Sequence, residues 1–191
     1  MSLFQNVVII AILIIAAGFL SLTEIALAGA RKVKLKILAE SGDERAQKVL
    51  DLQHQSADFF AASQIGLNAV AILGGILGEA AFRPFFVHLV DRFYDGPWTE
   101  TIGFVLSFTF VTSLFILFAD LMPKRLAMIA PEKIAVSVIN PIQVFIKICK
   151  PLAWFINAIA NLLFRLFKVN TTRDDNITFD DISAVMEAGA Q

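Results

Sequence analysis

The chain has few of the residues on which disulfide frameworks, thiolate metal clusters and most catalytic sites depend. Among its 191 residues there are one cysteine, two histidines and one tyrosine. The lone Cys149 excludes an internal disulfide and a cysteine cluster for a metal. Charged residues amount to 17%, against about 25% in a typical soluble protein. No basic surface with interleaved aromatic residues, no nucleophile–base pair and no phosphate-binding loop is recognisable. The sequence therefore indicates neither a nucleic-acid partner nor an enzyme.

Apolar residues, by contrast, are abundant and gathered into long runs. They make up 57% of the chain and include eighteen phenylalanines. Because about 20 apolar residues cross a bilayer as a helix, three transmembrane helices are predicted, at about residues 3–30, 59–79 and 101–122. Strands of a membrane barrel would instead alternate over about 10 residues. The sequence therefore predicts an all-α integral membrane protein of a plasma or inner membrane, surrounded by lipid.

The distribution of basic residues predicts the orientation of these spans. Six of the sixteen Lys and Arg residues lie between the first and second spans, two lie between the second and third, and eight follow the third. Loops rich in Lys and Arg stay in the cytoplasm. The N-terminus and the loop at residues 80–100 are therefore predicted outside, and the C-terminus is predicted in the cytoplasm.

The region after the third span is apolar but interrupted. Residues 131–168 contain Pro141, Pro151 and several charges, and the longest charge-free piece after Pro151 has only 13 residues. This length favours interfacial or re-entrant helices, and a hairpin of two tilted half-spans is the competing interpretation. Residues 1–170 then form the membrane domain, and residues 171–191 begin an acidic cytoplasmic linker helix.

Asp120 is the strongest candidate for a functional residue, because ionisable groups at a hydrocarbon boundary are costly and usually serve a purpose. Pro123 removes one helical hydrogen bond and clashes with the carbonyl of Ala119, so a helix break is predicted there. A carboxylate beside freed carbonyls suits a hard cation. The alternative is a helix that ends at the interface with Asp120 paired to Lys124.

The first predicted span carries Ser21 and Glu24, which lie three residues apart and so share one helix face. Both offer oxygen atoms near the cytoplasmic end of the span. For Glu24 the alternative is simple pairing with Arg31 or Lys32 at the membrane surface.

The second predicted span carries Ser63, Gln64 and Asn68. Gln64 and Asn68 lie four residues apart on one face, with Gly66 between them. A local break at Gly66 could free backbone carbonyls as ligands. The alternative is hydrogen bonding between helices with glycine-mediated packing.

Together these residues predict one cation site built from one residue of each span. The principal ligands are Ser21, Asn68 and Asp120. A donor set of oxygen alone disfavours zinc, copper or iron and suits magnesium, sodium or an organic ammonium. The secondary candidates are Glu24, Ser63, Gln64, Gly66 and Ala119.

Three motifs carry a resemblance to a known family. Residues 19–27 (FLSLTEIAL), 64–68 (QIGLN) and 119–124 (ADLMPK) resemble the transmembrane DUF21 domain of the CorC/CNNM family, often labelled hemolysin-like and linked to magnesium and cobalt efflux. The resemblance implies three transmembrane helices, a juxtamembrane belt helix and a homodimer. It also implies a dehydrated cation at the positions that match Ser21, Asn68 and Asp120.

The end of the chain and the third motif refine this resemblance. Residues 177–182 look like the start of the acidic region that leads into paired CBS domains, which bind ATP in the family and are missing here. The third motif usually reads Gly-Glu-x-x-Pro-Lys, whereas Ala119 and Asp120 stand here. The shorter carboxylate changes the ion geometry, and magnesium demands near-ideal octahedral ligands.

The sequence therefore predicts a bacterial inner-membrane cation exporter domain. Magnesium is the first substrate expected, and no further cofactor is. The chain also closely resembles a proteobacterial branch of the family associated with export of putrescine and cadaverine, so diamines are the alternative substrate. An alternative of a different class is a membrane anchor and dimerisation module for the cytoplasmic CBS domains.

Overall fold

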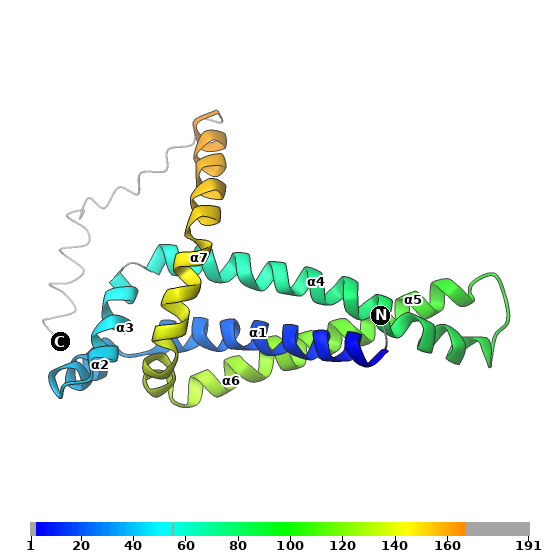
Figure 1. The fold of residues 1–191 in the computed structure, drawn as a ribbon, viewed down its shortest axis with the longest axis horizontal. Coiled ribbons are helices and arrows are strands. Elements are labelled where there is room, and N and C mark those ends of the chain that lie inside the picture. The colour runs from blue at the N-terminus through cyan, green and yellow to red at the C-terminus, as the bar shows by residue number, and fades with distance from the viewer. Residues whose placement is uncertain (1–2, 55, 167–191) are drawn as a thin grey trace, which may run out of the picture. The chain divides into compact units, whose positions relative to one another are not determined.

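The computed structural model describes residues 3–54 and 56–166, and every secondary-structure element in these ranges is a helix (Figure 1). The all-α prediction is confirmed for this part of the chain. The predicted acidic helix at 171–191 lies outside the described residues. The elements are α1 (Leu3–Gly29), α2 (Lys32–Glu40), α3 (Glu44–His54), α4 (Ser56–Asp91), α5 (Thr99–Leu114), η1 (Phe115–Leu121), α6 (Met122–Ile129) and α7 (Pro131–Leu166).

The chain divides into two compact units, residues Met1–Ala153 and Trp154–Gln191. In the first unit, α1 packs against α4 and also against η1 and α6, while α4 and α5 pack against each other. In the second unit the structure describes residues 154–166, the C-terminal part of α7, where Trp154, Leu162 and Leu166 are exposed. All the contacts discussed below belong to the first unit.

Helix α4 runs without interruption past Gly66, so the break considered there is not formed and the alternative of glycine-mediated packing holds. Gly66 instead allows neighbours to approach the helix closely. A Cβ atom at Gly66 would lie 2.6 Å from Cζ of Phe145 and 2.8 Å from Cδ1 of Leu20. A small residue at a helix contact is a common packing device in membranes. The helix also extends beyond the predicted span of 59–79, because it continues through Pro84 to Asp91.

The predicted break before Pro123 is also absent. Helix α5 continues through the π-helical segment η1 directly into α6, and Leu121 and Met122 both keep helical backbone angles. Met122 donates its backbone N–H to the carbonyl of Leu117, five residues back. Single π turns of this kind often occur at functional sites. The proline therefore changes the hydrogen-bond register and does not end the helix.

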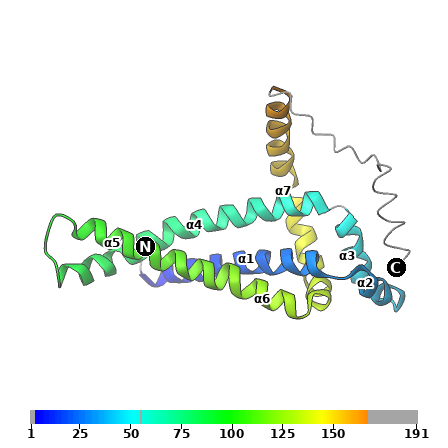
Figure 2. The ribbon, with the colours of Figure 1, turned by 180° about the vertical axis from the view of Figure 1, so that it is seen from behind.

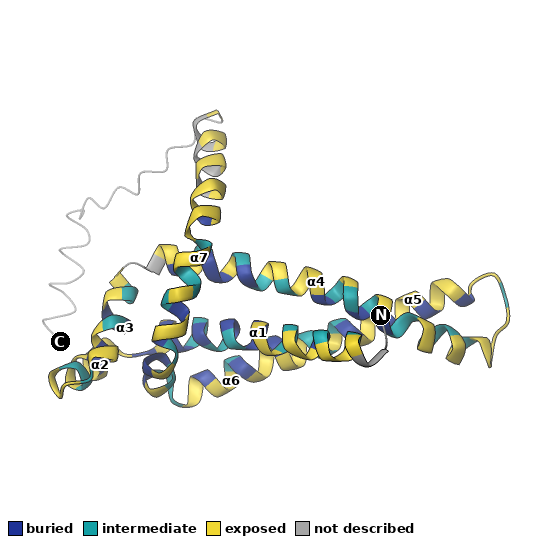
Figure 3. Cartoon of the chain, viewed as in Figure 1, coloured by how far each residue is buried: buried dark blue, intermediate teal, exposed yellow. Residues whose placement is uncertain are grey.

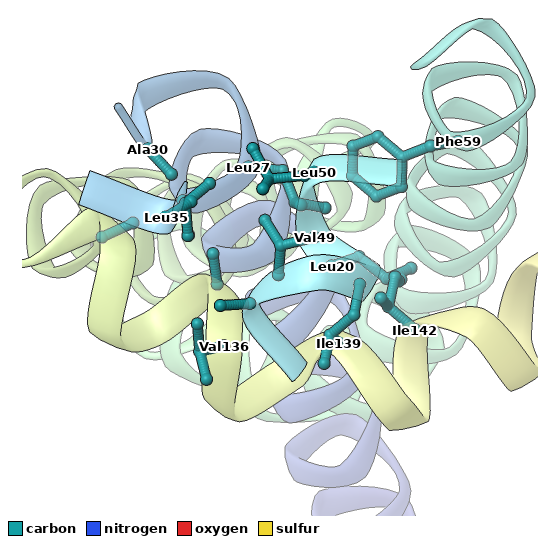
Figure 4. Close-up of a cluster of buried hydrophobic side chains, with 14 residues drawn as sticks. Leu20, Leu27, Ala30, Leu35, Val49, Leu50, Phe59, Val136, Ile139 and Ile142 are labelled. Carbon is teal, nitrogen blue, oxygen red and sulfur yellow. The ribbon is translucent and has the colours of Figure 1, made fainter. Parts of the chain in front are cut away.

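The buried core lies where α2, α3 and the first part of α7 meet α1 and α4. Its largest buried side chains include Leu35, Val49, Phe59, Ile139 and Ile142 (Figure 4). Buried residues in Figure 3 also follow the lines along which α1 contacts α4 and α6. The outward faces of α1, α4 and α5 are apolar and exposed, which suits contact with lipid.

Within the described residues, four helical segments are long and apolar enough to cross a membrane, one more than predicted. They are Gln5–Gly29, Ala57–Asp91, Thr99–Ile129 and Pro131–Ile156. The fourth arises because Pro141 and Pro151 lie inside α7 and do not end it. Residues 131–153 of α7 run across α1 and α4 in Figures 1 and 2, not along them. The number of spans and their orientation stay predictions.

Candidate cation site

Ser21 and Asp120 meet between α1 and η1. The Ser21 hydroxyl donates a hydrogen bond of 2.9 Å to Oδ1 of Asp120. Ser21 is fully buried, and a buried hydroxyl without a partner is unfavourable. Gly18 lies one turn earlier on α1, and its missing side chain leaves room for η1 and the ring of Pro123. Two of the three predicted ligands are thus brought into direct contact.

Lys124 completes the surroundings of the carboxylate. Its Nζ lies 2.5 Å from the same Oδ1 of Asp120, one turn further along the helix. The Asp120 side chain is 48% exposed and that of Lys124 is 34% exposed. The pairing that the sequence offered as an alternative therefore exists alongside the contact to Ser21. Asp120 accepts from one hydroxyl and one primary ammonium, and it remains accessible.

The backbone of η1 supplies a further oxygen, at the residue before Ala119. In the five-residue register, the N–H partner of the Phe118 carbonyl would come from Pro123, which has no N–H. The carbonyl of Phe118 is therefore left without a helical N–H donor. This oxygen faces α1, because it lies 3.4 Å from the position of a Cβ on Gly18. A proline signals such a carbonyl, but the sequence does not reveal the π register.

Glu24 lies in a separate contact between α1 and α4. The side-chain amide of Gln64 donates a hydrogen bond of 3.3 Å to Oε1 of Glu24. None of the ion pairs in the described part of the chain joins Glu24 to Arg31 or Lys32. Two secondary candidates are thus paired with each other, and the surface pairing expected as an alternative for Glu24 is not formed.

The two remaining candidates on α4 differ in their exposure. Asn68 is exposed, and no hydrogen bond joins it to Ser21 or Asp120 among the described side chains. Ser63 is fully buried, and its hydroxyl has no hydrogen-bond partner in the described structure. Ser63 therefore holds an unused donor within the bundle, whereas Asn68 stays apart from the contact at Asp120.

The arrangement offers one carboxylate, a buried hydroxyl and a backbone carbonyl. Within the described residues, no three acidic, histidine or cysteine side chains are close enough to hold a metal ion. The charge already bound at Asp120 is a primary ammonium. Charge-assisted hydrogen bonds of this kind are shorter and stronger than neutral ones. The site is thus suited to an ammonium group or to an ion held by few protein charges.

The sequence of the chain matches one family model and several known proteins. The family model described as the cyclin M transmembrane N-terminal domain, CNNM, matches residues 8–191. The polyamine export protein of Escherichia coli K12 is 51% identical over 186 residues, which cover 97% of this chain and 42% of that protein. The polyamine export protein of Haemophilus influenzae is 45% identical over 191 residues, 100% of this chain and 44% of that protein. The chain thus spans less than half the length of these curated relatives.

Proposed function

Because the chain belongs to the CNNM transmembrane-domain family, we propose that it forms the substrate pathway of a diamine exporter. It is a multi-pass protein of the inner membrane. The names of the relatives from Escherichia coli and Haemophilus influenzae support a polyamine as the substrate. Since the chain covers less than half of these relatives, the export activity of the whole protein is part of the proposal.

The observation that carries the proposal is the primary ammonium bound to Asp120. Lys124 presents to Oδ1 the same group that either end of putrescine or cadaverine presents. An ammonium has three donors, which the carboxylate and the Phe118 carbonyl could accept. Ser21 holds the carboxylate in place through its hydrogen bond. A diamine that takes the place of Lys124 leaves the charge of the carboxylate compensated.

Magnesium, the first substrate expected from the sequence, is the second candidate. The oxygen-only set of Ser21, Asp120 and the Phe118 carbonyl favours it. Magnesium requires near-ideal octahedral ligands at about 2.0–2.1 Å and gives up its water reluctantly. Lys124 would have to leave Oδ1 before the ion could bind there. A flexible diamine makes fewer geometric demands, so it ranks ahead of magnesium.

Release of each substrate from proteoliposomes tests the proposal. The full-length protein would be reconstituted with labelled putrescine or with magnesium inside, as wild type, Asp120→Asn and Glu40→Gln. Asp120→Asn keeps the shape of the side chain and removes its charge. Glu40→Gln is the matched control, because Glu40 is an exposed acid at the end of α2.

Putrescine release that is lost in Asp120→Asn and kept in Glu40→Gln is the expected result. Release of magnesium without putrescine would overturn the choice of substrate. Equal release by all three proteins would show that Asp120 is not a ligand. No release of either substrate by wild-type protein that is correctly inserted would favour the membrane anchor and dimerisation module.

A further inference from the structure

A second carboxylate on α4 is paired with a cation one turn later, far along the chain from Asp120. Nε of Arg83 donates a hydrogen bond of 2.5 Å to Oε1 of Glu79. The guanidinium carbon of Arg83 also lies 5.0 Å from the centre of the Phe104 ring. The cation is therefore held between a carboxylate and an aromatic face, which are the two surfaces that organic cations prefer.

An open cavity of about 510 Å³ lies beside this pair on the exposed face of α4 and α5, where its lining residues Ile72 and Ile76 are exposed. Glu79 lies in its wall, together with Phe104, Phe108 and Thr112. The rings of Phe104 and Phe108 stack with their centres 6.0 Å apart and their planes 19° apart. On the α4 side the wall includes Gly75, where an added Cβ would meet no atom within 4 Å. The space thus combines a carboxylate with a flat apolar wall.

A second open cavity of about 330 Å³ also has Phe104 in its wall. It is lined by Arg83, Glu100, Thr101 and Phe104. Phe104 therefore borders both cavities, with Glu79 in one wall and Glu100 in the other. Two carboxylates separated by aromatic surface match a linear molecule with an ammonium at each end and methylene groups between.

The position of Glu79 along α4 places this group near the end of a membrane span. The 36 residues of α4 would extend about 54 Å at 1.5 Å per residue, whereas the hydrocarbon core is about 30 Å thick. Glu79 lies 22 residues after Ala57, where the candidate span begins. With the predicted orientation it faces the outer boundary, and its side chain is only 15% exposed.

We propose that Glu79, Phe104 and Phe108 form a second binding site, for a linear organic diammonium, at the outer end of the α4–α5 pair. Arg83 is its resident cation, which an incoming ammonium displaces from Glu79. Glu79 is the one carboxylate among the described residues in the wall of the larger cavity, and a single carboxylate beside aromatic rings favours an organic ammonium over magnesium, which requires near-ideal octahedral oxygen ligands. Its place on an export route rests on the proposed function, whereas its binding chemistry does not.

Equilibrium binding of labelled cadaverine tests this site separately from the first one. The full-length protein would carry Asp120→Asn throughout, so that the site at Asp120 (the inner site) is removed. In this background Glu79→Gln should weaken binding by about tenfold or more, because an ammonium–carboxylate bond is lost. Arg83→Gln should strengthen binding, because the competing cation is gone. An ion pair with a purely structural role predicts no gain in Arg83→Gln.

Two phenylalanine variants supply a matched control. Phe104→Leu should weaken cadaverine binding by about two- to thirtyfold through loss of the cation–π contact. Phe85→Leu, on α4, should not change it, because Phe85 is exposed and lines neither cavity. A gel-filtration profile equal to that of the parent protein shows that each variant is folded. If Glu79→Gln does not fold, the Arg83→Gln and Phe104→Leu variants decide whether the second site exists.

The outcomes separate this proposal from the one for the inner site. Absence of cadaverine binding in the Asp120→Asn background, or equal competition by magnesium, would overturn the second site. Unchanged binding in both Phe104→Leu and Arg83→Gln would do the same. Glu79-dependent binding by a protein that releases no putrescine would overturn only the proposed export function.

Discussion

Replacement of Gly78 by alanine should destabilise the membrane domain, whereas the same replacement at Gly75 should not. A Cβ on Gly78 would lie 2.4 Å from Cγ1, 3.1 Å from Cγ2 and 3.3 Å from Cβ of Val111 on α5. Val111 is only 1% exposed, and its branched side chain cannot turn away from all three contacts. At Gly75 an added Cβ meets nothing within 4 Å.

The two substitutions share every effect except this contact. Both lie inside α4, so each gains about 0.8–1.0 kcal/mol of helix propensity when glycine becomes alanine. Overpacking at Gly78 costs about 1–3 kcal/mol. Gly75→Ala should therefore be as stable as the wild type or more so. Gly78→Ala should be less stable than Gly75→Ala by about 1–3 kcal/mol, a difference that is independent of the propensity term.

Unfolding of the two variants by sodium dodecyl sulfate in mixed micelles measures this difference directly. The helical circular dichroism signal would be followed for the wild type and both variants under the same lipid and detergent conditions. Equal midpoints for Gly78→Ala and Gly75→Ala would refute the close packing of α4 on α5 at Val111. Such a result would also weaken the case for the cavity that Glu79 and Phe104 line on these two helices.

Further predictions concern the site at Asp120 and the turn between α2 and α3. Ser21→Ala removes the hydroxyl that holds Asp120 and should raise the Kd for putrescine by roughly two- to tenfold in equilibrium dialysis. Lys124→Gln removes the resident ammonium and should lower that Kd; a higher Kd would contradict its role as a competitor. The hydrogen bond from the Arg45 side chain lowers the pKa of Asp43, so its stabilising effect is present above the ordinary pKa and is lost as the pH falls through the lowered one. Arg45→Ala should raise this pKa toward its ordinary value in a carbon-13 NMR titration.

The contact between Ser21 and Asp120 could be predicted from the sequence because polar groups in a hydrocarbon environment must find one another. The existence of the three long helices at the predicted spans could also be predicted, from the length of the apolar runs. The position of Asn68 could not be predicted, because the rotation of α4 about its axis depends on packing. That packing is decided by Gly66, Gly74 and Gly78, which direct one side of α4 toward its neighbours.

Neither the predicted break at Pro123 nor the one considered at Gly66 is formed, for related reasons. Glycine and proline weaken an isolated helix, but neighbouring helices can stabilise it. At Gly66 the contacts with Leu20 and Phe145 stabilise a continuous helix. At Pro123 a change to the five-residue register accommodates the ring and leaves the Phe118 carbonyl without a helical donor. Local propensity alone cannot distinguish a break from these alternatives.

The two resident cations give the proposed exporter a way to release its substrate. Moving a dication outward against a potential of about 100 mV costs about 4.6 kcal/mol, equivalent to a concentration ratio of roughly 2,000. A site on such a route must bind weakly enough to let the substrate leave. At Asp120 and Glu79 an arriving ammonium gains only the difference between its own contacts and those of Lys124 or Arg83. When it departs, the tethered cation returns and no carboxylate is left bare. Lys124→Gln should therefore bind putrescine more tightly and, for that reason, release it more slowly.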